Sequence, residues 1–463
     1  MIFPTVQFAI FFPLVLAVSW ALMRHQRLWK PFMLAASYAF YGAAGWEFCV
    51  ILAGLTFGNQ VAAKWIHRTE GVVARKRIMV AAVALDLGVL GVFKYYGFFA
   101  QEINNVLGSV GLGLSAPLVA LAIPLGVSFI TFQAISYTVD VYRRTIEPAS
   151  IVDVGLYLAF FPHVVAGPIV RAKEFLPQLA APRDPRNVPV GAAIGLIALG
   201  LVKKVMIADY LAREVVDPVF AVPEAYAAPD VALASYAYAA QIFCDFSGYT
   251  DIAIGVALLC GFVFPQNFDR PYAALGFQRF WRGWHMTLSR FLRDFLYIPL
   301  GGSRGGKLLT YRNLMITMVL GGLWHGAAWT FVLWGALHGA GLAAERALSG
   351  RFTTPAVVRW LVTFHLIVLG WVLFRSPDLG IAADVIGQLG DFGAATLWTV
   401  PAVLAVIAVV GLQLMPRRPI DAVRLRLEAL NPAALGLGLA AVVMLVAATV
   451  PSQGVPPFIY FQF

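Results

Sequence analysis

Residues 313–339 read NLMITMVLGGLWHGAAWTFVLWGALHG, and this stretch decides the class of fold. It contains no Lys, Arg, Asp or Glu, and its ionisable side chains are those of His325 and His338. A helix that spans a membrane needs about 20 mainly apolar residues. The stretch is long and apolar enough to predict a segment buried in a lipid bilayer.

The whole chain has the composition of a membrane protein. Of its 463 residues, 60% are hydrophobic and 13% are charged, whereas about a quarter of the residues of a soluble chain are charged. So few charges leave too little polar surface to cover a soluble particle of this size. The composition excludes a disordered chain, a coiled coil and an ordinary cytosolic enzyme, and it predicts an all-α polytopic membrane protein.

The positions of Lys and Arg predict the topology. The net charge is +10, but the cations lie in short runs between apolar stretches, which is typical of cytoplasmic loops rather than of a nucleic-acid-binding surface. No Lys or Arg precedes Arg24, whereas a secretory signal begins with positive charge. Residues 1–23 are therefore expected to form an uncleaved first helix with its N-terminus outside.

The cationic runs divide the chain into about ten to twelve membrane segments. The inside runs are residues 24–30, 64–77, 143–144 and 417–426. The expected crossings are residues 1–23, 31–63 (out and back, with a turn at 42–45), 78–99, 119–141, 189–212, 231–264, 313–344, 357–375, 401–415 and 433–450. Three stretches without Lys or Arg are expected outside, namely residues 100–118, 217–230 and 376–400.

Two parts of the chain do not fit simple crossings. Residues 150–170 hold Pro162, Gly167 and Pro168 within an apolar run, which predicts broken or re-entrant backbone that must be buried in protein or line a wet cavity. Residues 265–312 carry many Arg residues and aromatics but only two acids. They predict an inside-facing basic region of short amphipathic helices within a single domain of residues 1–463. No internal repeat is present, which argues against an inverted-repeat transporter.

His325 is the strongest candidate for a functional side chain, because an ionisable group inside an apolar segment is costly. With Arg312 at the inner edge, 13 helical residues at about 1.5 Å each put His325 about 20 Å deep, near or past the midplane. The glycines near His325 leave the backbone accessible to another helix or a ligand, and the tryptophans can line a cavity. These residues are Gly321, Gly322 and Gly326, and Trp324 and Trp329. A buried histidine that only bonds a backbone carbonyl is the alternative.

His285 lies in the sequence FWRGWHMTLSRFLR at residues 280–293. Arg282, His285 and Ser289 would share one face of a continuous helix. The residues alone favour a solvated amphipathic helix here over a site.

The next stretch, GGSRGG at residues 301–306, is rich in glycine. With Arg304 and Lys307, its backbone N–H groups can hold phosphates, although a flexible loop would have the same composition. Arg282 and Arg293 complete the set of cations that can attract phosphates.

The remaining polar residues predict structure more than chemistry. Asp245 and Asp251 are six residues apart and so lie on different helix faces, which favours a structural polar network over an acid/base pair, with Asp245 also a candidate for lining a tunnel. The other histidines are His163, equally consistent with a structural or a pocket role, His338 and His365, expected to be packed, and His25 and His67, in inside loops. Neither these residues nor the three cysteines, Cys49, Cys244 and Cys260, have the spacing of a metal site.

Several stretches together resemble the membrane-bound O-acyltransferase superfamily, in particular its bacterial branch with the alginate O-acetyltransferase AlgI and the D-alanyl transfer protein DltB. They are NFDRPY (267–272), FWRGWHMTLSRFLRDFLYIPLGG (280–302) and residues 313–339, with PLGVSFITFQAISYTVDVYRR (124–144), FFPHVVAGPIVRAKEFLPQL (160–179) and residues 241–262. The resemblance runs from about residue 5 to the C-terminus, and the histidine block is its most specific part.

The resemblance implies a ring of tilted and re-entrant helices around a central tunnel. It also implies that His325 is the family's invariant histidine and His285 its second signature position, both catalytic. An acyl thioester then arrives from the cytoplasm, so that acetyl-CoA is a donor substrate and no cofactor is permanently bound.

The sequence therefore predicts an O-acyltransferase of the bacterial inner membrane. We expect a neutral His325 to take the proton of an attacking hydroxyl. The acceptor is expected to be an extracytoplasmic polysaccharide or a serine of a periplasmic acetyltransferase, with polysaccharide biosynthesis proteins as further partners. The alternatives are a proton-coupled transporter or flippase in polysaccharide export, and a noncatalytic scaffold of an export complex.

Overall fold

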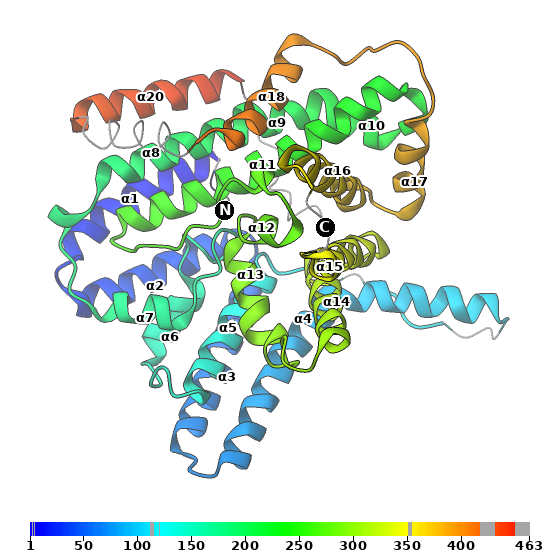
Figure 1. The fold of residues 1–463 in the computed structure, drawn as a ribbon. Coiled ribbons are helices and arrows are strands. Elements are labelled where there is room, and N and C mark those ends of the chain that lie inside the picture. The colour runs from blue at the N-terminus through cyan, green and yellow to red at the C-terminus, as the bar shows by residue number, and fades with distance from the viewer. Residues whose placement is uncertain are drawn as a thin grey trace. The chain divides into compact units, whose positions relative to one another are not determined.

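The computed structural model describes residues 1, 3, 5–111, 115–119, 121–350, 354–416 and 431–449. Within these ranges all regular structure is helical, and they contain no strand (Figure 1). This confirms the all-α prediction. The chain divides into two compact units, residues 1–193 with 253–265 and residues 194–252 with 266–463.

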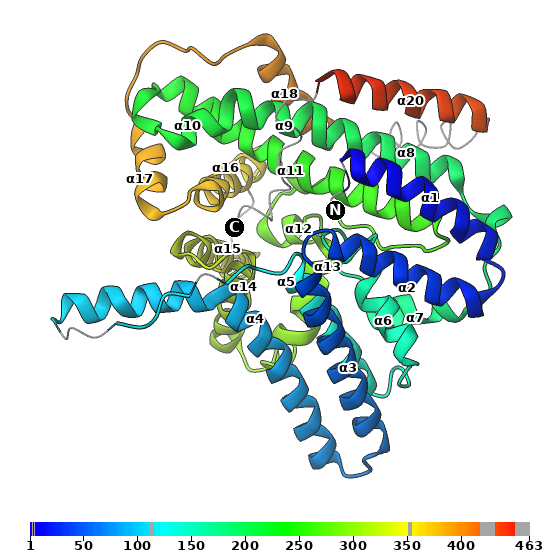
Figure 2. The ribbon, with the colours of Figure 1, turned by 180° about the vertical axis from the view of Figure 1, so that it is seen from behind.

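Unit 1 is built from the N-terminal helices. They are α1 (Val6–Leu22), α2 (Gln26–Gly42), α3 (Trp46–Arg68), α4 (Val72–Ser109), α5 (Val127–Tyr142), α6 (Ile151–Ala159), α7 (Ala172–Ala180) and the 3-10 turn η1 (Pro185–Asn187). The turn between α2 and α3 lies at residues 43–45, as predicted. The prediction of a loop at 100–118 is wrong in its first part, because α4, which is 38 residues long, ends only at Ser109. Both views show its C-terminal end extending away from the other helices of the unit (Figures 1 and 2).

The predicted break at residues 150–170 is present in unit 1. Helix α6 ends at Ala159, and the irregular backbone before α7 is buried throughout. The ring nitrogen Nε2 of His163 lies 2.8 Å from the carbonyl oxygen of Tyr157, and the ring stacks on Phe264 with centroids 5.2 Å apart. A broken segment is tolerated at membrane depth when protein covers it. His163 lies within this buried segment and contacts its neighbours there.

Unit 2 begins with a long apolar helix and ends with the C-terminal helices. The first part comprises α8 (Val190–Leu201, whose first residues belong to unit 1), η2 (Val202–Ala208), α9 (Asp209–Leu211), η3 (Ala212–Val216), α10 (Asp217–Ala221), η4 (Pro223–Ala225) and α11 (Ala228–Leu259, in unit 2 up to Ile252). The second part comprises η5 (Pro271–Ala273), α12 (Phe277–Trp281), α13 (Met286–Leu292), η6 (Arg293–Tyr297), α14 (Lys307–His325), α15 (Trp329–Leu348), α16 (Ala356–Arg375), α17 (Leu379–Gln388), α18 (Val400–Leu414) and α20 (Pro432–Thr449). Residues 265–306 form short helices and turns, and the prediction that they are amphipathic and face the inside stays a prediction.

Residues 190–221 form one candidate span despite its two adjacent lysines. Lys203 Nζ lies 2.6 Å from an oxygen of Asp251, and Lys204 Nζ lies 2.7 Å from oxygens of both Asp209 and Asp245. Pairing offsets the cost of holding these charges inside an apolar structure. The predicted polar network at Asp245 and Asp251 is therefore present.

Glycines bring α14 and α15 into close contact (Figure 1). A Cβ atom on Gly322 would lie 2.2 Å from the carbonyl oxygen of Phe331, and one on Gly335 would lie 2.4 Å from that of Met318. Only glycine permits this approach of two backbones. Gly322 therefore serves close contact between the two helices.

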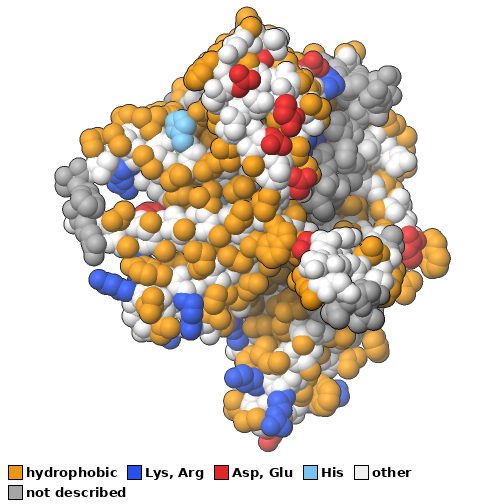
Figure 3. Space-filling model, turned by 90° about the vertical axis from the view of Figure 1, so that its right-hand side faces the viewer, with side chains coloured by type: hydrophobic (Ala, Val, Ile, Leu, Met, Phe, Trp, Pro, Cys, Tyr) orange, Lys and Arg blue, Asp and Glu red, His pale blue; other side chains and the backbone are white. Residues whose placement is uncertain are grey.

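Five helices are long and apolar enough to cross a membrane, namely residues 46–68, 72–109, 190–221, 228–259 and 356–375. Four shorter apolar helices lie at residues 6–22, 379–388, 400–414 and 433–446. Neither α14 nor α15 is among the five, and the cationic run at 417–426 lies outside the described residues. Hydrophobic side chains predominate on the face drawn in Figure 3, as expected of a surface that contacts lipid.

Candidate active site

The structure brings the two predicted catalytic histidines together in unit 2. The ring centroids of His285 and His325 are 6.5 Å apart, and the planes are inclined by 54°. His285 is fully buried, and His325 is 3% exposed. The two imidazoles are 40 positions apart in the sequence, so their proximity is a property of the fold.

His325 is the last residue of α14 and is surrounded by aromatic rings. The ring centroids of Trp324, Trp334 and Phe374 lie 5.0, 5.1 and 5.2 Å from that of His325. These rings come from α14, α15 and α16. At Gly326 the backbone becomes extended and the helix ends, and a Cβ there would lie 2.0 Å from the ring of Phe331. Packing of these three helices therefore fixes the position of the imidazole.

His285 does not lie on a continuous helix, so the predicted shared face with Arg282 and Ser289 is wrong. Helix α12 ends at Trp281, α13 begins at Met286, and His285 occupies the turn between them with φ +40°. The prediction of a solvated helix face is also wrong, because the imidazole is buried against the ring of Phe246 at 4.6 Å. Burial lowers the pKa of His285 to about 3, and the ring is therefore neutral near pH 7.

Asn267 holds the turn that carries His285. Its side-chain oxygen Oδ1 lies 3.2 Å from His285 Nδ1, and it accepts hydrogen bonds from the N–H and the hydroxyl of Thr287 at 3.1 and 2.8 Å. Its carbonyl oxygen accepts a further bond from the N–H of Met286 at 2.9 Å. Three successive residues are thereby tied to a single asparagine.

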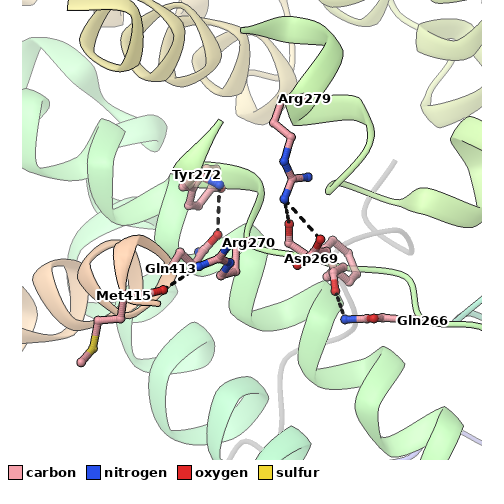
Figure 4. Close-up of polar contacts among 8 residues, drawn as sticks. Gln266, Asp269, Arg270, Tyr272, Arg279, Gln413 and Met415 are labelled. Atoms are coloured by element: carbon pink, nitrogen blue, oxygen red, sulfur yellow. Dashed lines mark hydrogen bonds and ion pairs between the residues drawn. The ribbon is translucent and has the colours of Figure 1, made fainter. Parts of the chain in front are cut away.

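The segment that contains Asn267 is itself anchored on both sides (Figure 4). Arg279 of α12 lies 3.2 Å from the carboxylate of Asp269. The backbone N–H of Tyr272 donates to the side chain of Gln413 of α18 at 3.0 Å, and Arg270 donates to the carbonyl oxygen of Met415 at 2.6 Å. A Cβ on Gly283 would lie 2.5 Å from the carbonyl oxygen of Asp269, so the turn before His285 requires glycine.

The predicted donor-binding cations are not gathered into one buried cluster. Arg282, Arg304 and Lys307 are exposed, and Arg293 pairs with its neighbour Asp294 at 2.6 Å. These positions are compatible with attraction of an anionic substrate from solution, where exposed charges act over about 10 Å. Their role stays a prediction.

The three residues predicted to line a tunnel have different environments. Trp324 is buried beside both histidines, with its ring 6.1 Å from that of His285. Trp329 is 51% exposed at the start of α15. Asp245 is buried and lies 2.7 Å from Lys204.

The other histidines are outside this site. His338 is buried, as predicted, but the prediction that His365 is packed is wrong, because this residue is exposed and its Nδ1 bonds the carbonyl oxygen of Leu361 at 2.7 Å. Within the ranges that the structure describes, no three His, Cys, Asp or Glu side chains form a group that could hold a metal ion.

Comparison with known proteins identifies the family. The profile of the membrane-bound O-acyltransferase family (MBOAT) matches residues 33–373, which include both histidines and Asn267. The chain belongs to the membrane-bound O-acyltransferase family. The chain is thus a multi-pass membrane enzyme that transfers an acyl group to oxygen, which favours the enzyme over the transporter and scaffold alternatives.

Individual relatives of this O-acyltransferase agree with the family match. The chain is 41% identical over 393 residues to a probable alginate O-acetylase AlgI of Pseudomonas putida, covering 83% of this chain and 79% of that protein. It is 42% identical over 370 residues to a probable alginate O-acetylase AlgI of Pseudomonas aeruginosa, covering 78% and 69%. A peptidoglycan O-acetyltransferase of Helicobacter pylori is 37% identical over 401 residues, covering 79% and 75%.

Sequence reasoning missed three side chains at the candidate site of this O-acyltransferase. Trp334 and Phe374 lie against His325, and Asn267 bonds the turn of His285. The aromatic residues carry no signal that separates them from ordinary core residues. Asn267 did carry one, because it is an asparagine that opens one of the stretches on which the resemblance rests.

Proposed function

We propose that this O-acyltransferase transfers an acetyl group from acetyl-CoA, supplied from the cytoplasm, to a hydroxyl on the far side of the inner membrane. The acceptor is a polysaccharide or a serine of a periplasmic acetyltransferase that works with polysaccharide biosynthesis proteins. The observation that carries the proposal is the buried pair of imidazoles, His285 and His325, with rings 6.5 Å apart. The acetyl group is favoured because the relatives described above are named as acetylases or an acetyltransferase.

The chemistry requires a base, since a hydroxyl is a weak nucleophile at neutral pH. In the proposed step the hydroxyl oxygen attacks the thioester carbonyl carbon, the carbon–oxygen bond forms and the carbon–sulfur bond breaks. The hydroxyl proton passes to the imidazole of His325 and then to the departing thiolate, which leaves as the free thiol of coenzyme A. General base catalysis of this kind contributes about 10²- to 10⁴-fold.

The donor is proposed to approach over the basic region at residues 265–312. Arg282, Arg304 and Lys307 are exposed there, and exposed cations raise the local concentration of an anion such as coenzyme A. The midplane depth expected for His325 would let a donor from the cytoplasm meet an acceptor from the other side.

The test uses membrane vesicles that contain the full chain. Acetyl-CoA is supplied on the cytoplasmic face, and release of coenzyme A is measured together with acetyl incorporation into an alginate oligosaccharide on the opposite face. We expect both signals with the wild type and neither with His325→Ala. The matched control is His365→Ala, because His365 is exposed and lies outside the site. Wild-type release of coenzyme A by folded His325→Ala would contradict the proposal.

A further inference from the structure

The hydrogen bonds around Asn267 determine which nitrogen of His285 carries the proton. The atom of the Asn267 amide that faces His285 also accepts the backbone N–H of Thr287 at 3.1 Å. A backbone N–H only donates, so this atom is the oxygen Oδ1 and not the nitrogen. The oxygen carries no hydrogen, and the bond of 3.2 Å to His285 Nδ1 therefore requires a proton on Nδ1.

A neutral imidazole carries one N–H group. With the proton on Nδ1, the other nitrogen, Nε2, holds a lone pair and can only accept a hydrogen bond. His285 Nε2 is buried and has no hydrogen-bond partner among the described residues. A buried acceptor without a donor is unfavourable, so this atom can accept a hydrogen bond from a molecule that enters the site.

The two substrates of the proposed reaction differ in what they offer this atom. The thioester group that reacts has a carbonyl oxygen and a sulfur and no N–H or O–H group, so it cannot donate to Nε2. The single proton of the attacking hydroxyl goes to His325 in the proposed step, but a polysaccharide acceptor carries further O–H groups, and one of these can donate to Nε2. The lone pair on Nε2 therefore selects the acceptor over the thioester.

We propose that Asn267 is a positioning residue that holds His285 in the Nδ1–H form, so that His285 Nε2 binds a hydroxyl of the polysaccharide acceptor other than the one that attacks. This inference rests on the proposed function for the identity of the hydroxyl, whereas the assignment of the proton rests only on the contacts of Asn267. His285 then holds the acceptor so that its attacking hydroxyl lies beside His325, whose ring is 6.5 Å from that of His285.

The first experiment measures the proton position without any substrate. The full chain is labelled with ¹⁵N-histidine in lipid vesicles, and the signals of His285 are identified by their loss in His285→Gln. We expect the wild type to show His285 in the neutral Nδ1–H form, and Asn267→Ala to shift the ring toward Nε2–H. A wild-type ring in the Nε2–H form would overturn the inference, whether or not the chain transfers acetyl groups.

Asn267→Asp is the conservative variant that separates positioning from folding. An aspartate oxygen accepts from Nδ1–H and from Thr287 as the amide oxygen does. The lost group is Asn267 Nδ2, which is buried without a hydrogen-bond partner in the described part of the chain. We expect Asn267→Asp to keep the Nδ1–H signal and to recover most of the activity lost in Asn267→Ala.

The second experiment measures kinetics with acetyl-CoA and an alginate oligosaccharide as probes. We expect Asn267→Ala to lower kcat by about 10- to 100-fold and to raise the KM of the oligosaccharide while the KM of acetyl-CoA stays within about twofold. A rise in the KM of acetyl-CoA with an unchanged oligosaccharide KM would overturn the assignment to the hydroxyl. Loss of activity in the wild type itself would count against the proposed function and not against the ¹⁵N result.

Asn59→Ala is the matched control for the loss of a buried asparagine. Asn59 is 3% exposed and bonds Asp86 at 2.8 Å and Thr138 at 2.6 Å in unit 1, outside the candidate site. We expect it to lower stability but to leave the His285 signal and both KM values unchanged. A shift of the His285 signal in Asn59→Ala as large as that in Asn267→Ala would overturn the positioning role.

Discussion

Two of the places where unit 2 buries ionisable side chains treat charge in opposite ways. Around Lys204 the ionisable groups are paired, with two carboxyl groups 2.7 Å from one amino group. Around His285 the ring is neutral, and its Nε2 atom has no partner in the described residues. Loss of one partner of a buried ion pair destabilises a fold, whereas an imidazole nitrogen with a free lone pair can bind a donor or accept a proton. The comparison predicts that substitutions in the two places will separate stability from activity.

The largest effect is expected at His325, on activity alone. His325→Ala removes the proposed base from its aromatic surroundings, and we expect acetyl transfer to fall by about 10²- to 10⁴-fold. The melting temperature in detergent micelles is expected to change little relative to that effect. The transfer rate per folded molecule and the melting curve are measured for both the wild type and His325→Ala. A fall in activity that merely follows the loss of folded protein would remove the distinction between the two places.

The second effect is expected at Lys204, on stability. Lys204→Met leaves the carboxyl groups of Asp209 and Asp245 buried without their cation, which costs about 3–5 kcal/mol. The adjacent Lys203→Met is the matched control, because Lys203 and Asp251 are 21% and 17% exposed against 2% for Lys204. Denaturation in mixed micelles measures both variants. An equal loss of unfolding free energy in Lys204→Met and Lys203→Met would show that burial does not determine how much an unpaired carboxyl group destabilises the fold.

The third effect tests packing beneath His325. Gly322→Ala puts a methyl group 2.2 Å from the carbonyl oxygen of Phe331, so α14 and α15 must separate. We expect a loss of about 3 kcal/mol in stability and a fall in activity, because the end of α14 carries His325. The control is Gly411→Ala in α18, where a methyl group meets nothing within 4 Å. Gly411→Ala is expected to be neutral or slightly stabilising.

The sequence was sufficient where hydropathy or charge acts locally. Apolar length predicted the helices, and the cost of unpaired charge in an apolar helix predicted the polar network at Asp245 and Asp251. The broken segment before Arg171 followed from its prolines and glycine. Hydropathy did not show that α4 continues to Ser109, because a polar helix end and an outside loop have the same composition.

Long-range contacts explain what the sequence did not predict at the site. The spacing of Arg282, His285 and Ser289 fits a helix, but the bond between Asp269 N–H and the carbonyl oxygen of Gly283 at 2.8 Å ends the helix there. The same contact brings Asn267 to His285, and neither residue shows this locally. The identity of the residues predicted that His285 and His325 are functional. Their arrangement depends on the packing of α14 against α15 and on the anchored turn between α12 and α13.

The smallest effect concerns pH and tests whether His285 is neutral. Its pKa of about 3 in the folded chain lies below the ordinary value of about 6.5 for an exposed histidine, because burial disfavours the cation. The unfolded chain therefore binds more protons between these values, so that His285 contributes a loss of stability as the pH falls below about 6.5 and no pH dependence above it. The slope approaches about 1.4 kcal/mol per pH unit. Melting curves of the wild type and His285→Gln at pH 7.5 and pH 5 measure it, and the wild type is expected to lose more stability on acidification. Parallel losses in the two proteins would mean that His285 is not held neutral by burial, and the contrast with Lys204 would then not hold.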